Sequence, residues 1–185
     1  MKLAILVTGG TFDKEYNKLT GRLHFRRTHV PEMLSLGRCR VKTRLHAVMM
    51  KDSLAMNAND RQRILRACRN APESRIVITH GTDTMEKTAR FLGPKINNKT
   101  IVLTGAMVPY RFGSSDGMFN LGAAIALAQV LPPGVFVAMN GRCFRWDQVT
   151  KNRRRGYFRT KIPCGLRASA HNRKQIKTKG KKGDQ

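Results

Sequence analysis

Hydroxyl and carboxylate side chains are concentrated in THGTDT, residues 79–84, which directly follows an apolar run. Thr82 and Asp83 fall where a helix is expected to begin, so free backbone N–H groups would lie beside them. This combination is typical of a ligand-binding loop, although Asp83 could instead serve only as a helix cap. We interpret His80, in the same segment, as a hydrogen-bonded structural residue rather than a base.

The segment TGGT, residues 8–11, is a second candidate for chemistry because it also follows an apolar run. The Thr11 hydroxyl would be a nucleophile if a nearby base or cation lowered its pKa, and a turn cap otherwise. The segment lacks both the G-x-G-x-x-G and the G-K-[ST] patterns, so nucleotide binding is the least supported function. Lys151, Tyr16 and Ser53 carry useful functional groups, but each alone is typical of a surface or turn residue.

Alternating strand and helix patterns explain how these loops could meet. The expected strands are 3–8, 41–49, 75–79, 99–105 and 134–140, with 142–146 pairing beside the last, and the expected helices are 30–36, 57–68, 83–92 and 116–131. This alternation predicts parallel βαβ units, and the continuous apolar strands indicate helices on both faces of the sheet. Ligands of such sheets bind beyond the carboxyl ends of the strands, where TGGT and THGTDT both lie.

Length and composition indicate one soluble domain with a substantial core. The chain has 185 residues, of which 41% are hydrophobic, and no apolar run approaches the about 20 residues of a membrane helix. We interpret the start, MKLAILVTGG, as a buried strand rather than a signal sequence, and so expect a cytoplasmic protein. The four cysteines lack C-x-x-C spacing, so we expect buried thiols and no metal site.

The charge is strongly positive. The chain has 36 Lys and Arg against 11 Asp and Glu, a net charge of +25, which would attract polyanions without selectivity. Periodicity ends after residue 158, so we predict a folded domain over 1–158 and a basic, disordered tail over 159–185.

Several motifs together resemble the bacterial-type L-asparaginase/glutaminase family. They are TGGT, KDSLAM, THGTDTME, GAM-x-P followed by S-x-DG-x-FNL, and MN…VTK, in the family's order and spacing. The resemblance covers residues 1 to about 158 and matches the N-terminal catalytic domain, as in the short members of the family. It implies a flavodoxin-like, doubly wound, mostly parallel sheet, and hydrolysis of the L-asparagine side-chain amide to L-aspartate and ammonia without metal or cofactor.

The resemblance also implies a role for individual residues. Thr11 would be the acylated nucleophile, and Tyr16 would cover it from a mobile lid. Thr82, Asp83 and Lys151 would form a second catalytic group, in which the lysine favours the deprotonated hydroxyl of Thr82. Asp83 would also bind the substrate ammonium, with Thr82 beside it, and Ser53 would bind the substrate α-carboxylate.

Three features depart from the family pattern. Phe12 and Asp13 follow TGGT where long members have smaller residues, arginines are frequent near Lys151, and we expect no counterpart of the second domain of the long members in these 185 residues. L-Glutamine remains an alternative substrate, and a homodimer is expected. The alternative function is a catalytically weak fold that binds nucleic acid or another polyanion through its basic surface.

Overall fold

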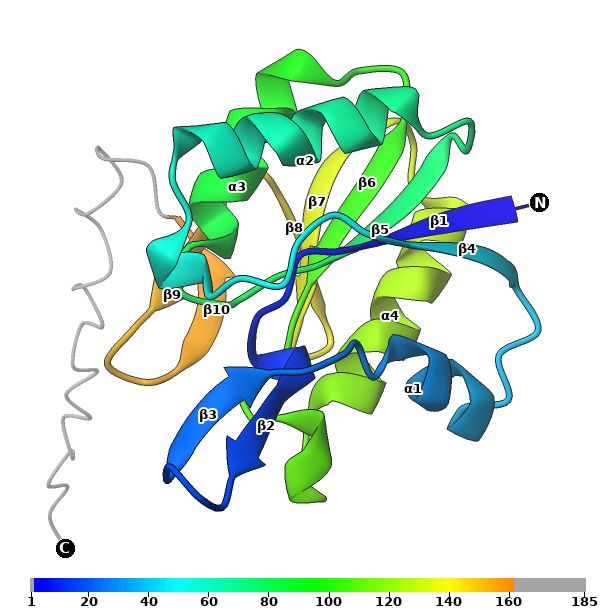
Figure 1. Ribbon diagram of the computed structural model, residues 1–185. Helices are drawn as coiled ribbons and strands as arrows, with labels where there is room; N and C mark the ends of the chain where they lie inside the picture. The colour runs from blue at the N-terminus through cyan, green and yellow to red at the C-terminus, as the bar shows by residue number, and fades with distance from the viewer. Residues whose placement is uncertain (1, 162–185) are drawn as a thin grey trace, which may run out of the picture.

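The computed structural model describes residues 2–161, which form one central sheet covered by helices on both faces (Figure 1). The strand order is β4-β1-β5-β6-β7-β8. The six strands are β1 (Lys2–Val7), β4 (Lys42–Ala47), β5 (Arg75–Thr79), β6 (Thr100–Thr104), β7 (Gly134–Met139) and β8 (Arg142–Arg145). The first five in this order are parallel, and β8 runs antiparallel to β7 at the edge. This is the flavodoxin-like order, so the predicted fold class is confirmed.

The helices divide into two pairs that cover opposite faces. The pairs are α2 (Ala58–Asn70) with α3 (Met85–Leu92), and α1 (Val30–Leu36) with α4 (Gly117–Val130). The first pair packs on one core cluster and the second pair on another, with the sheet between them (Figure 1). Each of the four predicted helices is therefore present, with ends that agree to within two residues.

Local sequence signals account for most of these elements. Residues 3–7 of β1 are buried on both faces of the sheet, which explains their uninterrupted apolar run. The start of α2 is a capping box, in which Asn57 accepts from the Asp60 backbone and Asp60 accepts from the Asn57 backbone. Short 3₁₀ turns complete the loops at η1 (Thr11–Asp13), η2 (Ser53–Ala55), η3 (Gly93–Lys95) and η4 (Tyr110–Phe112).

Two small hairpins were not predicted. They are β2 (Lys14–Asn17) with β3 (Arg22–Phe25), and β9 (Val149–Asn152) with β10 (Tyr157–Thr160). Their strands have only four residues each and mix charged, polar and apolar side chains, so they are too short to show the sustained alternation that predicts a half-buried strand. The predicted domain end at 158 falls inside β10, and the predicted disordered tail lies outside the described residues from 162 onward.

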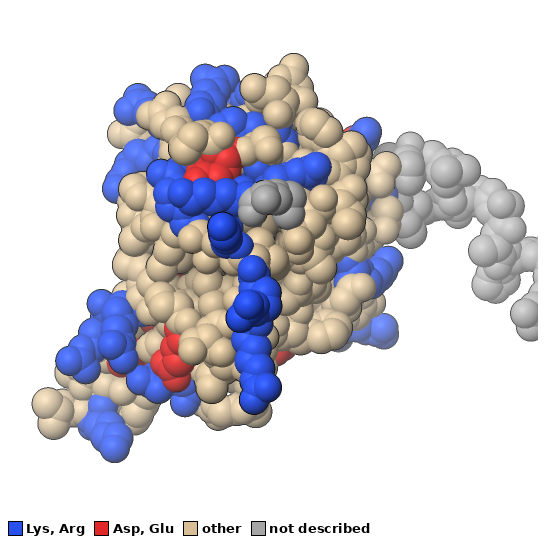
Figure 2. Space-filling view, turned by 90° about the vertical axis from the view of Figure 1, so that its right-hand side faces the viewer, with Lys and Arg blue, Asp and Glu red and all other residues tan. Residues whose placement is uncertain are grey.

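The expectation of buried thiols holds for Cys68 but is wrong for Cys143, which is exposed on the edge strand β8, while Cys39 is partly exposed. Among residues 2–161, no helix is both long and apolar enough to cross a membrane. Lys and Arg side chains lie in several separate groups over the face shown in Figure 2.

Candidate active site

Glycines bring the two predicted loops and the segment that carries Ser53 into direct contact at the carboxyl end of the sheet. A Cβ placed on Gly10 would lie 2.3 Å from the backbone nitrogen of Gly81, and one on Gly81 would lie 2.6 Å from Ser53 Oγ. Gly10 also has a positive φ of 91°, which favours glycine. These contacts place the turn that carries Thr11 against the loop that carries Thr82, with Ser53 on the other side of Gly81.

Lys151 joins the two polar residues that follow Gly81. Its ammonium donates to Thr82 Oγ1 and to Asp83 Oδ1, each at 2.7 Å. The Lys151 side chain is 5% exposed and the Asp83 side chain 42% exposed, so the cation is buried while the carboxylate keeps a free side toward solvent. A buried cation that donates to a hydroxyl stabilises the deprotonated form of that hydroxyl. The sequence-predicted trio of Thr82, Asp83 and Lys151 therefore lies together.

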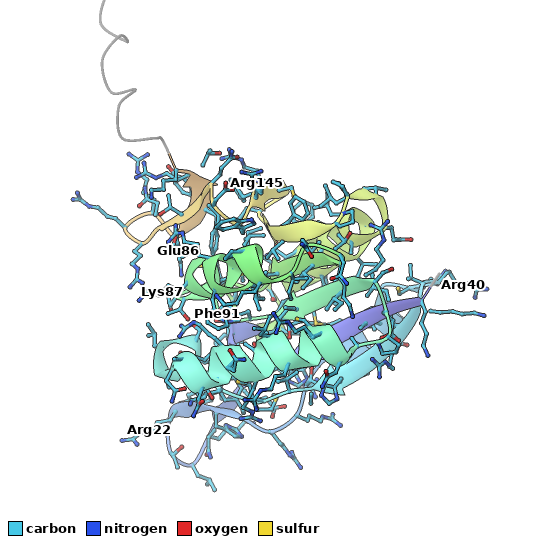
Figure 3. All side chains as sticks on the ribbon, turned by 90° about the horizontal axis from the view of Figure 1, so that it is seen from above. Arg22, Arg40, Glu86, Lys87, Phe91 and Arg145 are labelled. Atoms are coloured by element: carbon cyan, nitrogen blue, oxygen red, sulfur yellow. The ribbon has the colours of Figure 1, made fainter. Side chains whose placement is uncertain are left out.

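Lys151 is held in place from α3, although it lies on the β9–β10 hairpin. Its backbone N–H donates to Glu86 Oε2 at 2.8 Å, and the Arg90 guanidinium donates to the Val149 carbonyl at 2.6 Å. Val149 and Phe158 are buried in the core, which fixes both strands of the hairpin. Figure 3 shows Glu86 at the end of α3 that lies next to this hairpin. Sequence reasoning missed these contacts because Glu86 could be linked to Lys151 only if the hairpin had been predicted.

His80 holds the Gly81 loop in place through two hydrogen bonds of its ring. The buried ring donates from Nδ1 to the Gly81 carbonyl at 2.8 Å, and Nε2 accepts from the Thr88 hydroxyl at 2.8 Å. Burial lowers the pKa of His80 to about 4, so the ring is neutral near pH 7. The interpretation of His80 as a structural residue is confirmed.

Asp116 and Asn120, at the start of α4, position two further loops. Asp116 accepts from the backbone of Met107 and Val108, and Asn120 donates to the Gly105 carbonyl and accepts from the Asn140 backbone. Each of these bonds is between 2.9 and 3.1 Å long. Both residues lie in the motif S-x-DG-x-FNL, which sequence reasoning noted without assigning them a role.

The other two predicted site residues differ in their placement. Thr11 is partly exposed at the first position of η1, next to Gly10 and therefore close to the Gly81 loop. Tyr16 lies on β2 with a side chain that is 56% exposed, and its hydroxyl lies near Gly21 in the hairpin turn. The structure thus brings five of the six predicted residues to the carboxyl end of the sheet, and leaves Tyr16 on the surface of the β2–β3 hairpin.

The fold and these loops define a flavodoxin-like α/β domain with polar residues at the carboxyl ends of its strands, and comparison with known proteins identifies its family. The chain belongs to the family described as "Asparaginase, N-terminal", whose model matches residues 2–174. The L-asparaginase of Thermococcus kodakarensis is 32% identical over 158 residues, which are 82% of this chain and 48% of that protein. The glutaminase-asparaginase of Acinetobacter glutaminasificans is 49% identical over 80 residues, which are 41% of this chain and 24% of that protein.

Solved structures agree with this assignment. The thermostable L-asparaginase from Thermococcus kodakarensis superposes with a TM-score of 0.77 at 31% identity, covering 86% of this chain and 51% of that chain. The L-asparaginase I from Vibrio cholerae has a TM-score of 0.75 at 24% identity and supports the fold alone. The chain spans about half the length of these structures, which corresponds to the predicted match with one domain of the longer proteins.

Proposed function

We propose that this chain is an amidohydrolase that converts L-asparagine to L-aspartate and ammonia, with Thr11 as the nucleophile. The observation that carries the proposal is the hydrogen bonding of a buried lysine, Lys151, to both Thr82 and Asp83. The family assignment supports the same conclusion, because the relatives named above are L-asparaginases and glutaminase-asparaginases.

In the proposed first step, Thr11 Oγ attacks the carbon of the side-chain amide. The C–N bond then breaks, the proton of the Thr11 hydroxyl passes to the leaving nitrogen, and ammonia departs from an acyl-enzyme ester. Negative charge develops on the carbonyl oxygen during this attack, and nearby backbone N–H groups would stabilise it by a few kcal/mol each. In the second step, water oriented by Thr82 hydrolyses the ester and restores the Thr11 hydroxyl.

Lys151 assists through its charge. Because the ammonium is buried and lies 2.7 Å from Thr82 Oγ1, it favours the alkoxide form of Thr82 and so allows this residue to accept a proton from water. Asp83 balances the lysine charge with one oxygen. Its exposed side then remains available for the substrate ammonium.

Substrate recognition uses the same three loops. In this proposal Asp83 binds the ammonium and Ser53 binds the α-carboxylate, with the Gly81 loop between them. L-Glutamine has one more methylene than L-asparagine, a difference worth about 1–3 kcal/mol in a fitted pocket. We therefore propose both amides as substrates, with the shorter one preferred.

A coupled assay of ammonia release tests the proposal directly. The folded chain should release ammonia from L-asparagine, and Thr11→Ala and Lys151→Met should each abolish the release. Lys87 provides a matched control, because it is an exposed lysine on α3 and Lys87→Met should keep full activity (Figure 3). Failure of the folded wild-type chain to release ammonia from either amide would refute the proposal.

A further inference from the structure

The residues that follow Thr11 fix the base of the β2–β3 hairpin. Asp13 is buried, and its Oδ1 accepts from the Thr28 hydroxyl at 3.0 Å and from the His29 backbone at 2.9 Å. Thr28 and His29 follow β3, so these bonds join the two ends of the hairpin to each other. The hairpin is therefore closed at its base immediately beside the proposed nucleophile.

Lys14, the first residue of β2, connects this hairpin to a different loop. Its ammonium lies 2.5 Å from Asp52 Oδ2, and the other oxygen, Asp52 Oδ1, accepts from the Leu54 backbone at 2.9 Å. Asp52 thereby caps η2, the turn that begins at Ser53. The Lys14 and Asp52 side chains are 21% and 36% exposed, so water screens this ion pair only in part.

The segment at Ser53 is held on its other side by the catalytic loop. The Thr84 hydroxyl donates to the Ser53 carbonyl at 2.8 Å, and Ser53 Oγ lies against Gly81. Asp52 and Ser53 consequently form the connection between the hairpin and the loop that carries Thr82.

Within residues 2–161, the far part of the hairpin has no comparable attachment. Tyr16, Leu19 and Leu23 are large apolar residues of this hairpin that are all exposed. The hairpin is thus fixed where it joins the domain and exposes apolar side chains beyond that point. Its position therefore depends on the contacts at its base.

We propose that Lys14 and Asp52 are positioning residues that couple the β2–β3 hairpin to the substrate-binding segment at Ser53. Binding of the substrate carboxylate at Ser53 is then linked, through η2 and the ion pair, to the position of the hairpin beside Thr11. The identity of the ligand at Ser53 rests on the proposed function, whereas the coupling of hairpin and segment does not. A partly exposed ion pair contributes about 0.2–1 kcal/mol, equivalent to a roughly 1.4- to 5-fold change in an opening equilibrium.

Hydrogen exchange measured by mass spectrometry tests the coupling in the ligand-free chain. Asp52→Asn removes the charge but keeps an oxygen that can cap η2. It should speed exchange of amides in residues 14–25 by about two- to fivefold. Asp147→Asn is the matched control, because it removes a carboxylate that pairs with Arg145 at the β8 edge, and should leave this exchange unchanged.

Kinetics test the effect on substrate binding. Asp52→Asn and Lys14→Met should each raise the KM for L-asparagine by about two- to fivefold with kcat changed by less than about twofold. The double variant should be no worse than either single variant, and Lys14→Arg should retain most of the wild-type affinity.

Each outcome decides one part of the inference. Faster exchange confined to residues 53–56 would assign Asp52 a capping role only and overturn the coupling, as would unchanged exchange in residues 14–25. Faster hairpin exchange with an unchanged KM would overturn the positioning role. If the wild-type chain releases no ammonia while Asp52→Asn still speeds hairpin exchange, the proposed function fails and the coupling stands.

Discussion

The unequal exposure of Lys151 and Asp83 makes their ion pair a sensitive test of the site. In Asp83→Ala the ammonium stays in a nearly buried position and keeps Thr82 Oγ1 as an acceptor. In Lys151→Met the carboxylate that loses its partner is 42% exposed and can be hydrated. The two substitutions break the same ion pair, yet they leave very different groups behind.

The magnitudes follow from this difference. Leaving a fully buried charge without its partner costs about 3–5 kcal/mol, and because this pair is open to solvent on one side we expect about 2 kcal/mol for Asp83→Ala. Lys151→Met loses a hydrogen bond to Thr82, which costs about 1 kcal/mol, and buries an apolar side chain that offsets part of this cost. In a domain of this size 1 kcal/mol corresponds to about 2–4 °C in Tm. We therefore expect Tm to fall by about 4–8 °C in Asp83→Ala and by at most about 4 °C in Lys151→Met.

Thermal unfolding followed by circular dichroism measures the two Tm values, and the ammonia assay measures activity on the same samples. Both variants should lose about 100-fold or more in activity, because each removes a group of the proposed catalytic trio. The stability and the activity are then separated, since the more stable variant is as inactive as the less stable one. A Lys151→Met protein that unfolds at a lower temperature than Asp83→Ala would refute the assignment of Lys151 as the buried member of the pair.

The remaining predictions concern two glycines, a buried histidine and two cysteines. Gly10→Ala should prevent formation of the active fold, because the φ of Gly10 is positive and the new Cβ would collide with the backbone of Gly81. Gly122→Ala is the opposite case, because Gly122 lies on the open surface of α4, and it should stabilise the protein by up to about 1 kcal/mol. Urea unfolding measures the free energy of unfolding of both variants. Burial lowers the pKa of His80 from 6.5 to about 4, so the free energy of unfolding should fall as pH drops from about 6.5 to about 4, and His80→Gln should flatten this part of the profile. Burial raises the pKa of Cys68 to about 12, so an aromatic disulfide reagent at pH 8 should label the exposed Cys143 in the native protein and leave Cys68 unlabelled until the protein unfolds.

Sequence patterns predicted the layered sheet because its elements carry strong periodic signals. The apolar runs at β1, β5 and β6 have no competing interpretation once helical patterns separate them. The hairpins gave no such signal, because strands of four residues are too short to show a period and are stabilised by pairing and by contacts elsewhere.

The candidate site was predictable to the extent that its residues lie in motifs at strand ends. Thr82 and Asp83 were found in this way, and Lys151 was assigned through the resemblance. Glu86 was not found, because its role depends on a contact between α3 and β9 that no local pattern encodes. Tyr16 is a different case. Its role as a cover of Thr11 depends on where the β2–β3 hairpin lies, and the residue type of Tyr16 does not predict that position.

The proposed catalytic cation is supplied by a two-stranded unit that is not hydrogen-bonded into the main sheet. Releasing that unit would withdraw the ammonium from its hydroxyl partner while the six-stranded sheet stayed intact. Inactivation by heat or denaturant should consequently run ahead of the loss of circular dichroism signal. Substitutions intended to prolong the proposed activity are therefore better placed at the contact between α3 and β9 than in the core of the main sheet.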